Sequence, residues 1–233
     1  MRPGEGSHHA AVAPGRVRIE TKGDLSCYEA PESSPETKPS ASAQWSKGCG
    51  GLFIEAGYEE IIVPAIWEQQ TFIDKGGPEI VRQMYAFDDK KGRPICLVPE
   101  ITGMIQESWR ASWSQSFRKP CRVFYVARCY RYERPQRGRY REFTQVGIEL
   151  LGGQAPFDRR EVEDLLRRIL DELDVEYEFD ARVKRGLGYY VEEGFEARCP
   201  QLGAQRQIAG GGRYAEGVGW AIGLDRLLLG LAC

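Results

Sequence analysis

The sequence predicts an α+β domain in which a mostly antiparallel sheet is flanked by helices. Two observations predict it. Residues 123–131 and 143–151 both alternate in side-chain character, and the segment between them carries Pro135 and Gly138, as expected of an antiparallel hairpin. Residues 161–173 place apolar side chains at helical spacing with acids in the first turn, which favours an amphipathic helix packed against that sheet.

We expect a leader followed by one domain. Residues 1–40 cluster Pro, Ser, Glu and Gly with little periodicity, which indicates a disordered or loosely packed segment. Residues 41–233 are enough to bury a sizeable core. Their expected order is helix, strand, helix, hairpin, helix, strands and a closing helix. The first helix, before Gly57, is weakened by three glycines, each of which costs about 1 kcal/mol relative to Ala in a helix interior.

Composition excludes several classes of function. The formal net charge of −2 argues against an extended nucleic-acid surface, although residues 118–122 and 131–141 form local basic patches. Both histidines, His8 and His9, lie in the leader, so a Ser-His-Asp triad, a His-paired cysteine and a His-rich zinc site are not expected, and we predict no metal site built by the protein.

The cysteines and the apolar runs bear on the compartment. The seven cysteines are odd in number and have no close pairs, so we expect neither a zinc knuckle nor a disulfide framework, but reduced, structural thiols. The chain shows no apolar run of membrane length and no secretory signal pattern. We therefore expect a cytoplasmic protein without a membrane partner.

The loop of the predicted hairpin is rich in arginine, whose planar fork donates in pairs and keeps its charge, as a polyphosphate site needs. A solvated charged hairpin is the alternative. Alternation places Arg131 and Glu133 on one face of the first strand, and Gln145 and Glu149 on one face of the returning strand. Together they predict a pocket for a zwitterion beside a site for an anion.

This pattern resembles the class II aminoacyl-tRNA synthetases, and histidyl-tRNA synthetase in particular. The second motif of that family is an Arg-x-Glu strand, an arginine loop and a returning strand with Gln and Glu. Five other segments are similar to family motifs in family order: GYEEIIVPAIWEQ at 57–69, LVPEITG at 97–103, RGLGYY at 185–190, AGGGRY at 209–214 and GWAIGLDRLLL at 219–229.

The resemblance implies roles for individual residues. Arg131, Arg185 and Arg226 would be the catalytic residues. ATP would be bound by Arg131, Glu133, Arg139, Phe143 and Arg226. Histidine would be bound by Glu100, Thr102 and Gln145 around its amino group, and by Glu149, Tyr190 and Tyr214 around its ring. Taken singly, each has a plainer alternative: Tyr189 and Tyr190 as core aromatics, Glu149 as a strand-surface acid, Arg226 as a salt-bridge partner.

The implied reaction needs no nucleophile from the protein. In the family, the carboxylate of the amino acid attacks the α-phosphate of ATP, giving an aminoacyl-adenylate and pyrophosphate, so the protein positions the reactants and neutralises charge. ATP with Mg²⁺, histidine and the acceptor end of tRNA are the implied substrates. A homodimer, formed through the first motif with Pro64, and a sheet of about six strands are implied as well.

The chain also departs from the family pattern. Val98, Ile101 and Gly188 stand where the family has arginine, glycine and aspartate. The interval between Gly152 and Arg185 is too short for the family's inserted domain and the third motif ends near Cys233, so we expect a catalytic domain without the inserted domain and without an anticodon-binding domain. Three hypotheses remain open: a histidine-activating enzyme, a non-catalytic histidine-sensing subunit like the regulatory partner of ATP phosphoribosyltransferase, and a degenerate paralogue.

Overall fold

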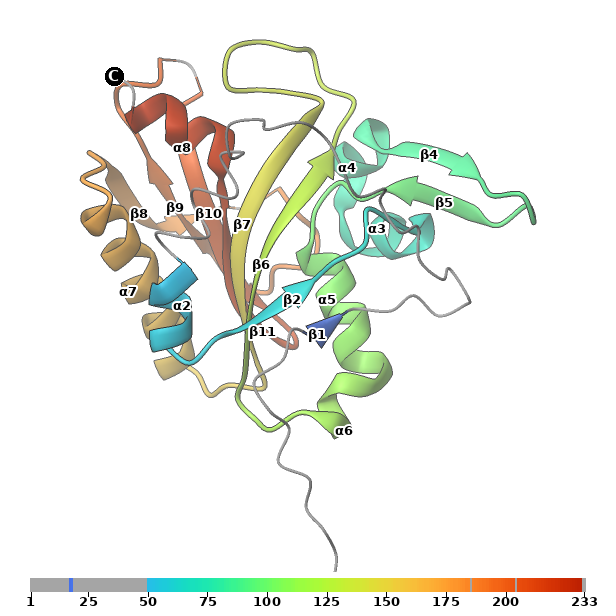
Figure 1. The fold of residues 1–233 in the computed structure, drawn as a ribbon, viewed down its shortest axis with the longest axis horizontal. Helices are drawn as coiled ribbons and strands as arrows, with labels where there is room; N and C mark the ends of the chain where they lie inside the picture. The colour runs from blue at the N-terminus through green and yellow to red at the C-terminus, as the bar shows by residue number, and fades with distance from the viewer. Residues whose placement is uncertain (1–16, 19–49, 185, 204, 232–233) are drawn as a thin grey trace, which may run out of the picture.

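The computed structural model describes residues 17–18, 50–184, 186–203 and 205–231. Its main sheet has eight strands in the order β1-β2-β6-β7-β11-β10-β9-β8 (Figure 1). The strands are β1 (Val17–Arg18), β2 (Glu59–Ile62), β6 (Cys121–Tyr130), β7 (Glu142–Leu151), β8 (Glu178–Val183), β9 (Gly194–Arg198), β10 (Gln207–Tyr214) and β11 (Gly217–Gly223). The pairs β1–β2 and β2–β6 are parallel, and the other pairs are antiparallel. The predicted α+β class is thus confirmed, with eight strands in this sheet instead of about six.

The hairpin β6–β7 is the centre of the sheet and confirms the hairpin prediction. Its register runs without interruption from the pair Cys121–Leu151 to the pair Tyr130–Glu142. Because neighbouring residues of a strand face opposite ways, Tyr125 enters the core on one face of the sheet and Phe124 the core on the other. Arg131 lies one residue beyond the end of β6, so the hairpin loop begins one residue earlier than predicted.

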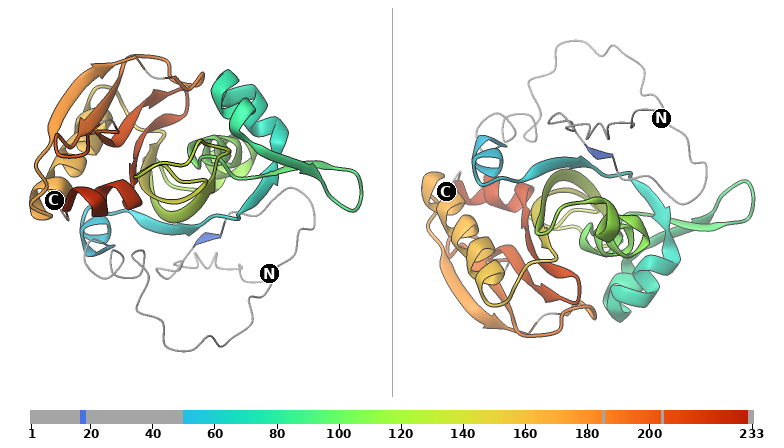
Figure 2. Two further views of the ribbon diagram at one scale, coloured as in Figure 1. Left: turned by 90° about the horizontal axis from the view of Figure 1, so that it is seen from above. Right: turned by 90° about the horizontal axis from the view of Figure 1, so that it is seen from below.

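A second, three-stranded sheet was not predicted. It has the order β3-β5-β4 and, with three short helices, lies beside the main sheet, and Figure 2 shows its β4–β5 hairpin projecting away from the main sheet. The elements of this region are β3 (Ile66–Glu68), α3 (Gln69–Lys75), α4 (Gly77–Gln83), β4 (Tyr85–Asp88), β5 (Pro94–Leu97) and α5 (Thr102–Ser108), followed by a π-helix (Trp109–Trp113) and α6 (Ser114–Ser116).

Helices cover both faces of the main sheet. One core contains the apolar side of α7 (Phe157–Glu172), with Val162 and Leu166 buried, and Leu227 of the closing helix α8 (Leu224–Leu231). The helix predicted from residue 161 therefore begins four residues earlier. The other core lies under α3 and α5. The first helix is short: α2 (Gly50–Glu55) includes two of the three glycines that were expected to weaken it.

One buried ion pair ties α7 to the sheet. Asp158, in the first turn of α7, is 4% exposed and accepts hydrogen bonds from both terminal nitrogens of Arg213 on β10. The guanidinium of Arg213 also lies 3.4 Å from Glu192. A carboxylate near a helix N-terminus is favoured by the helix dipole as well.

The thiols and the helix lengths can be described for part of the chain. The four cysteines within the described ranges are buried and unbonded to one another: Cys96, Cys121, Cys129 and Cys199. Within those ranges, no helix combines the length and the apolar character needed to cross a bilayer. The other three cysteines and nearly all of the leader, except Val17–Arg18, lie outside the described residues.

Candidate active site

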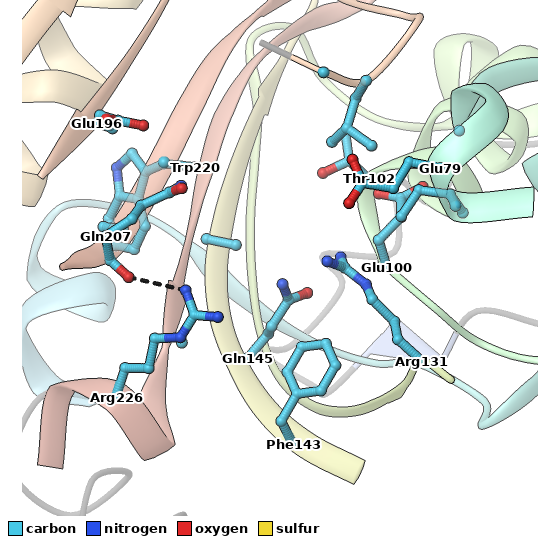
Figure 3. Close-up of a pocket in the computed structure, with 18 of the residues that line it drawn as sticks. Glu79, Glu100, Thr102, Arg131, Phe143, Gln145, Glu196, Gln207, Trp220 and Arg226 are labelled. Atoms are coloured by element: carbon cyan, nitrogen blue, oxygen red, sulfur yellow. Dashed lines mark hydrogen bonds between the residues drawn. The ribbon is translucent and has the colours of Figure 1, made fainter. Parts of the chain in front are cut away.

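Most of the predicted site residues line one pocket of about 370 Å³ on the sheet (Figure 3). Its lining includes Glu100, Thr102, Arg131, Glu133, Arg139, Phe143, Gln145, Tyr190 and Arg226. Strand β7, helices α5 and α8, and the segments after β5, β6 and β8 supply these side chains. Glu149 and Tyr214 are absent from the lining and lie directly behind it, bonded to each other. Arg185 lies outside the described residues.

Three arginines gather at one end of the pocket. Arg226 is positioned by α8, whose Asp225 accepts a hydrogen bond from the backbone N–H of Thr144 on β7. Its guanidinium donates to the carbonyl oxygens of Gly138 at 2.6 Å and Gln207 at 3.1 Å. Burial and the nearby cations of Arg139 and Arg131 lower the pKa of Arg226. Cations held close together in this way favour the binding of an anion between them.

The hairpin loop supplies the other polar groups at this end. Arg139 forms an ion pair with Glu133 at 2.6 Å, so two residues expected to bind ATP neutralise each other in this structure. Arg131 donates through Nε to the carbonyl oxygen of Pro99 at 2.8 Å, and its guanidinium lies 5.2 Å from the ring centre of Phe143. The aromatic ring and the guanidinium leave a flat, cationic surface suited to a nucleobase and its phosphates.

Two buried acids stand at the other end, Glu100 in the lining, next to Arg131, and Glu149 behind it. Glu149 is fully buried and accepts hydrogen bonds from the hydroxyls of Thr102 at 2.6 Å and Tyr214 at 2.7 Å. Burial outweighs these bonds and raises its pKa to about 8. Glu100 accepts from the backbone N–H of Gly103 at 2.9 Å and from the hydroxyl of Tyr189 at 3.3 Å, and burial raises its pKa too. Both carboxyls are therefore ready to gain a cationic or N–H partner.

Gln145 lies between the two ends, and its position is set by a cysteine. The side-chain oxygen of Gln145 accepts a hydrogen bond from the thiol of Cys129, 3.2 Å away across the β6–β7 hairpin. Burial raises the pKa of Cys129 to about 12, which keeps the thiol protonated as a donor. A cysteine read from the sequence as merely structural thus orients a pocket residue.

The structure shows the surroundings of the three residues that depart from the family pattern. Val98 and Ile101 are fully buried in the core under α3 and α5, and neither lines the pocket, so Ile101 does not crowd Glu100 from the pocket side. At Gly188, an added Cβ would lie 3.3 Å from the carbonyl oxygen of Lys75, tight against the backbone of α3. An aspartate at this position would need the backbone of α3 to shift.

The sequence missed several pocket residues. Tyr125, Tyr189, Gln207 and Trp220 line the pocket, and Glu196 does so from β9. Tyr189 rather than its neighbour Tyr190 makes the hydrogen bond to Glu100. Alternation in β6 could have placed Tyr125 on the face that carries Gln145 across the hairpin, but an aromatic residue in a central strand is most simply assigned to the core.

Comparisons with known proteins identify the family of the chain. The family model described as histidyl-tRNA synthetase matches residues 41–177. The histidine–tRNA ligase of Sulfolobus acidocaldarius is 41% identical over 141 residues, which make up 60% of this chain and 32% of that protein. The chain thus spans about a third of the length of the curated relatives it matches.

Solved structures show the same fold. Apo histidyl-tRNA synthetase from S. aureus has a TM-score of 0.69 at 20% identity, over 88% of this chain and 74% of that one. A protein titled ATP phosphoribosyltransferase regulatory subunit/histidyl-tRNA synthetase, from Bacillus halodurans, has a TM-score of 0.70 at 16% identity, over 92% and 85%. Since the family model covers more than half of the chain, including the hairpin and the segment with Glu100, the chain belongs to the histidyl-tRNA synthetase family.

Proposed function

We propose that this domain activates histidine with ATP, forming histidyl-adenylate and pyrophosphate. One observation supports the proposal above the others: a single pocket is lined by three arginines, Arg131, Arg139 and Arg226, and by the buried carboxyl Glu100, with the buried carboxyl Glu149 directly behind the lining. Such a pocket fits a substrate pair that brings polyphosphate and an amino acid together. A binding site for histidine alone has no use for the arginine end.

The proposed chemistry is transfer of an adenylyl group. A carboxylate oxygen of histidine attacks the α-phosphorus, the bond from that phosphorus to the bridging oxygen breaks, and pyrophosphate leaves with the electron pair. Arg131 is placed to stabilise charge on the α-phosphate, and Arg139 and Arg226 the charge of the leaving pyrophosphate. Arg185 keeps the catalytic role implied by the resemblance. Phe143 would stack on adenine, and Glu133 would accept a hydrogen bond from the adenine amino group.

Nucleotide binding then requires an exchange of partners in the hairpin loop. The ion pair between Glu133 and Arg139 must open for each to meet the nucleotide, so free ATP competes with an internal carboxylate. Mg²⁺ fits as part of the ATP complex, with phosphate oxygens among its ligands. The part of the chain that the structure describes holds no group of three His, Cys, Asp or Glu side chains that could bind a metal by itself.

Histidine recognition is assigned to the acid end. Glu100, Thr102 and Gln145 would surround the α-amino group, and Glu149, Tyr190 and Tyr214 would act on the ring. Glu149 and Tyr214 lie behind the pocket lining, so they would act there through a small movement of Thr102 or of Glu149 itself. A cytoplasmic location, a homodimer and transfer of histidine to the acceptor end of tRNA complete the proposal.

Histidine-dependent exchange between ATP and radiolabelled pyrophosphate tests the proposal directly. We expect exchange with histidine and Mg²⁺ and not with the other amino acids. Arg226→Ala should reduce it at least a hundredfold, the loss typical when a group that stabilises transition-state charge is removed. Arg168→Ala is the matched control, because Arg168 is an exposed arginine of α7 far from the pocket.

The same assay separates the alternatives. No exchange, with histidine bound in calorimetry, would point to a histidine-sensing subunit, an option kept open by the 85% coverage of the Bacillus halodurans structure. Neither exchange nor binding would leave a degenerate paralogue and would overturn the proposal.

A further inference from the structure

Tyr125 on β6 carries a buried hydroxyl that has no hydrogen-bond partner among the described residues. Its side chain is fully buried within the protein, yet Tyr125 belongs to the pocket lining. Buried hydroxyls are almost always paired, because an unpaired one loses its bonds to water without replacement. A buried, unpaired hydroxyl at a pocket wall is therefore a position where a ligand atom would be stabilised.

The strand opposite leaves room for this hydroxyl. Tyr125 and Gly147 are direct partners in the β6–β7 register. A Cβ at position 147 would come within 2.4 Å of the Tyr125 hydroxyl oxygen, so only glycine allows the ring to lie there. The absence of a side chain at Gly147 thus makes room for the hydroxyl of Tyr125.

Two neighbouring tyrosines do not offer the same group. The hydroxyl of Tyr214 donates to Glu149, and the hydroxyl of Tyr189 donates to Glu100. Burial first, and then the nearby carboxyl of Glu149, raise the pKa of Tyr125 well above its ordinary value, so its hydroxyl keeps its proton and can donate.

We propose that Tyr125 is a substrate-binding residue whose hydroxyl forms a hydrogen bond with a ring nitrogen of the bound amino acid. The inference rests on the proposed function and adds a specificity residue to it. A neutral imidazole has one N–H donor and one nitrogen acceptor. The acid end can accept from the N–H, and Tyr125 can donate to the other nitrogen, so the ring would be read at both positions. A ring without that acceptor would leave the hydroxyl unpaired, which is a strong basis for rejection.

Calorimetric titration of the full chain with histidine tests the inference. We expect Tyr125→Phe to weaken histidine binding roughly tenfold, the effect of losing one hydrogen bond to a buried donor. The thermal midpoint of the free variant should stay the same or rise, because phenylalanine removes a hydroxyl that has no partner in the free protein. Tyr130→Phe, the same change on the same strand but outside the pocket lining, should leave histidine binding unchanged.

Each outcome is decisive. If wild type binds histidine and Tyr125→Phe binds it equally well, the inference is wrong while the proposed function stands. If Tyr125→Phe loses binding and stability together, Tyr125 is structural and the inference is also wrong. If wild type does not bind histidine, the proposed function and the inference are both wrong.

A substrate analogue provides an independent check. β-(2-Thienyl)alanine has a five-membered ring without nitrogen, so its ring offers the hydroxyl of Tyr125 no nitrogen acceptor for a hydrogen bond. In competition with histidine in wild type, the analogue should bind weakly, and Tyr125→Phe should bind it about as well as wild type or better. A tenfold loss for the analogue as well would contradict a bond to a ring nitrogen.

Discussion

At the scale of single residues, Glu149 has an unusual charge state. It is fully buried, contacts two hydroxyls and has no cation among the groups that shift its pKa. Burial raises that pKa from 4.5 to about 8, so the carboxyl is mostly protonated near neutral pH when no ligand is bound.

This charge state predicts a pH-dependent stability. Between about pH 4.5 and 8, the unfolded chain releases the proton of Glu149 and the folded chain keeps it, so the folded state binds more protons and its stability falls as pH rises. Below this window the group contributes nothing. Glu149→Gln should therefore gain stability relative to wild type as pH rises, by at most about 1.4 kcal/mol per pH unit, in urea unfolding at pH 5, 6 and 7.

The control for this prediction lies on the same strand. The side chain of Glu142 is 50% exposed, and Glu142→Gln should not reproduce the trend. A stability difference between Glu149→Gln and wild type that is constant with pH would show that Glu149 is ionised throughout.

At the scale of elements, the hairpin loop is held to α8 through one glycine. Gly138 has φ +75°, where other residues are strained by about 1 kcal/mol or more, and its carbonyl accepts from Arg226. We expect Gly138→Ala to raise the KM for ATP severalfold in pyrophosphate exchange, with little change in the KM for histidine.

Gly92 offers a matched comparison. It has φ +73° in the β4–β5 turn, and an added Cβ there would meet no atom within 4 Å. Gly92→Ala should carry the same backbone strain without an effect on ATP. Equal changes in both variants would mean that the loop acts through general strain and not through Arg226.

A second prediction at this scale concerns the attachment of α7. Asp158→Ala leaves the largely buried guanidinium of Arg213 without its main partner, so the free energy of unfolding should fall by about 3 kcal/mol in urea unfolding. Asp164→Ala, on the same helix, breaks an exposed pair with Arg167 and should cost less than about 1 kcal/mol. Similar losses in the two variants would contradict the importance of burial.

The same scale shows which elements a sequence reveals. The β6–β7 hairpin was predictable because ten-residue strands alternate visibly and Pro135 and Gly138 mark the turn. The second sheet was missed because β3, β4 and β5 have three or four residues each, too few for a period to emerge. The start of α7 was missed because Phe157 is exposed and does not join its apolar side.

At the scale of the whole molecule, the site lies where long-range contacts decide the details. The sequence motifs predicted that Arg131, Gln145 and Arg226 would line one pocket, because each residue lies in a recognisable motif. It could not predict that Glu133 pairs with Arg139, or that Glu149 lies behind Thr102, because both depend on side-chain directions in the assembled pocket. Nor could it predict the unpaired hydroxyl of Tyr125, which requires knowing every neighbour.

The short strand β1 has a consequence for the behaviour of the molecule in solution. β2 lies between β6, which pairs with it at Glu59 and Glu60, and β1, which pairs with it at Ile61 and Ile62, so residues 17–18 cover part of the edge of β2 that faces away from β6. An uncovered strand with an exposed Ile62 is a template for adding strands from other molecules. We therefore expect β1 to protect this edge against aggregation, so that a chain shortened to begin at residue 41 scatters more light on storage than the full chain.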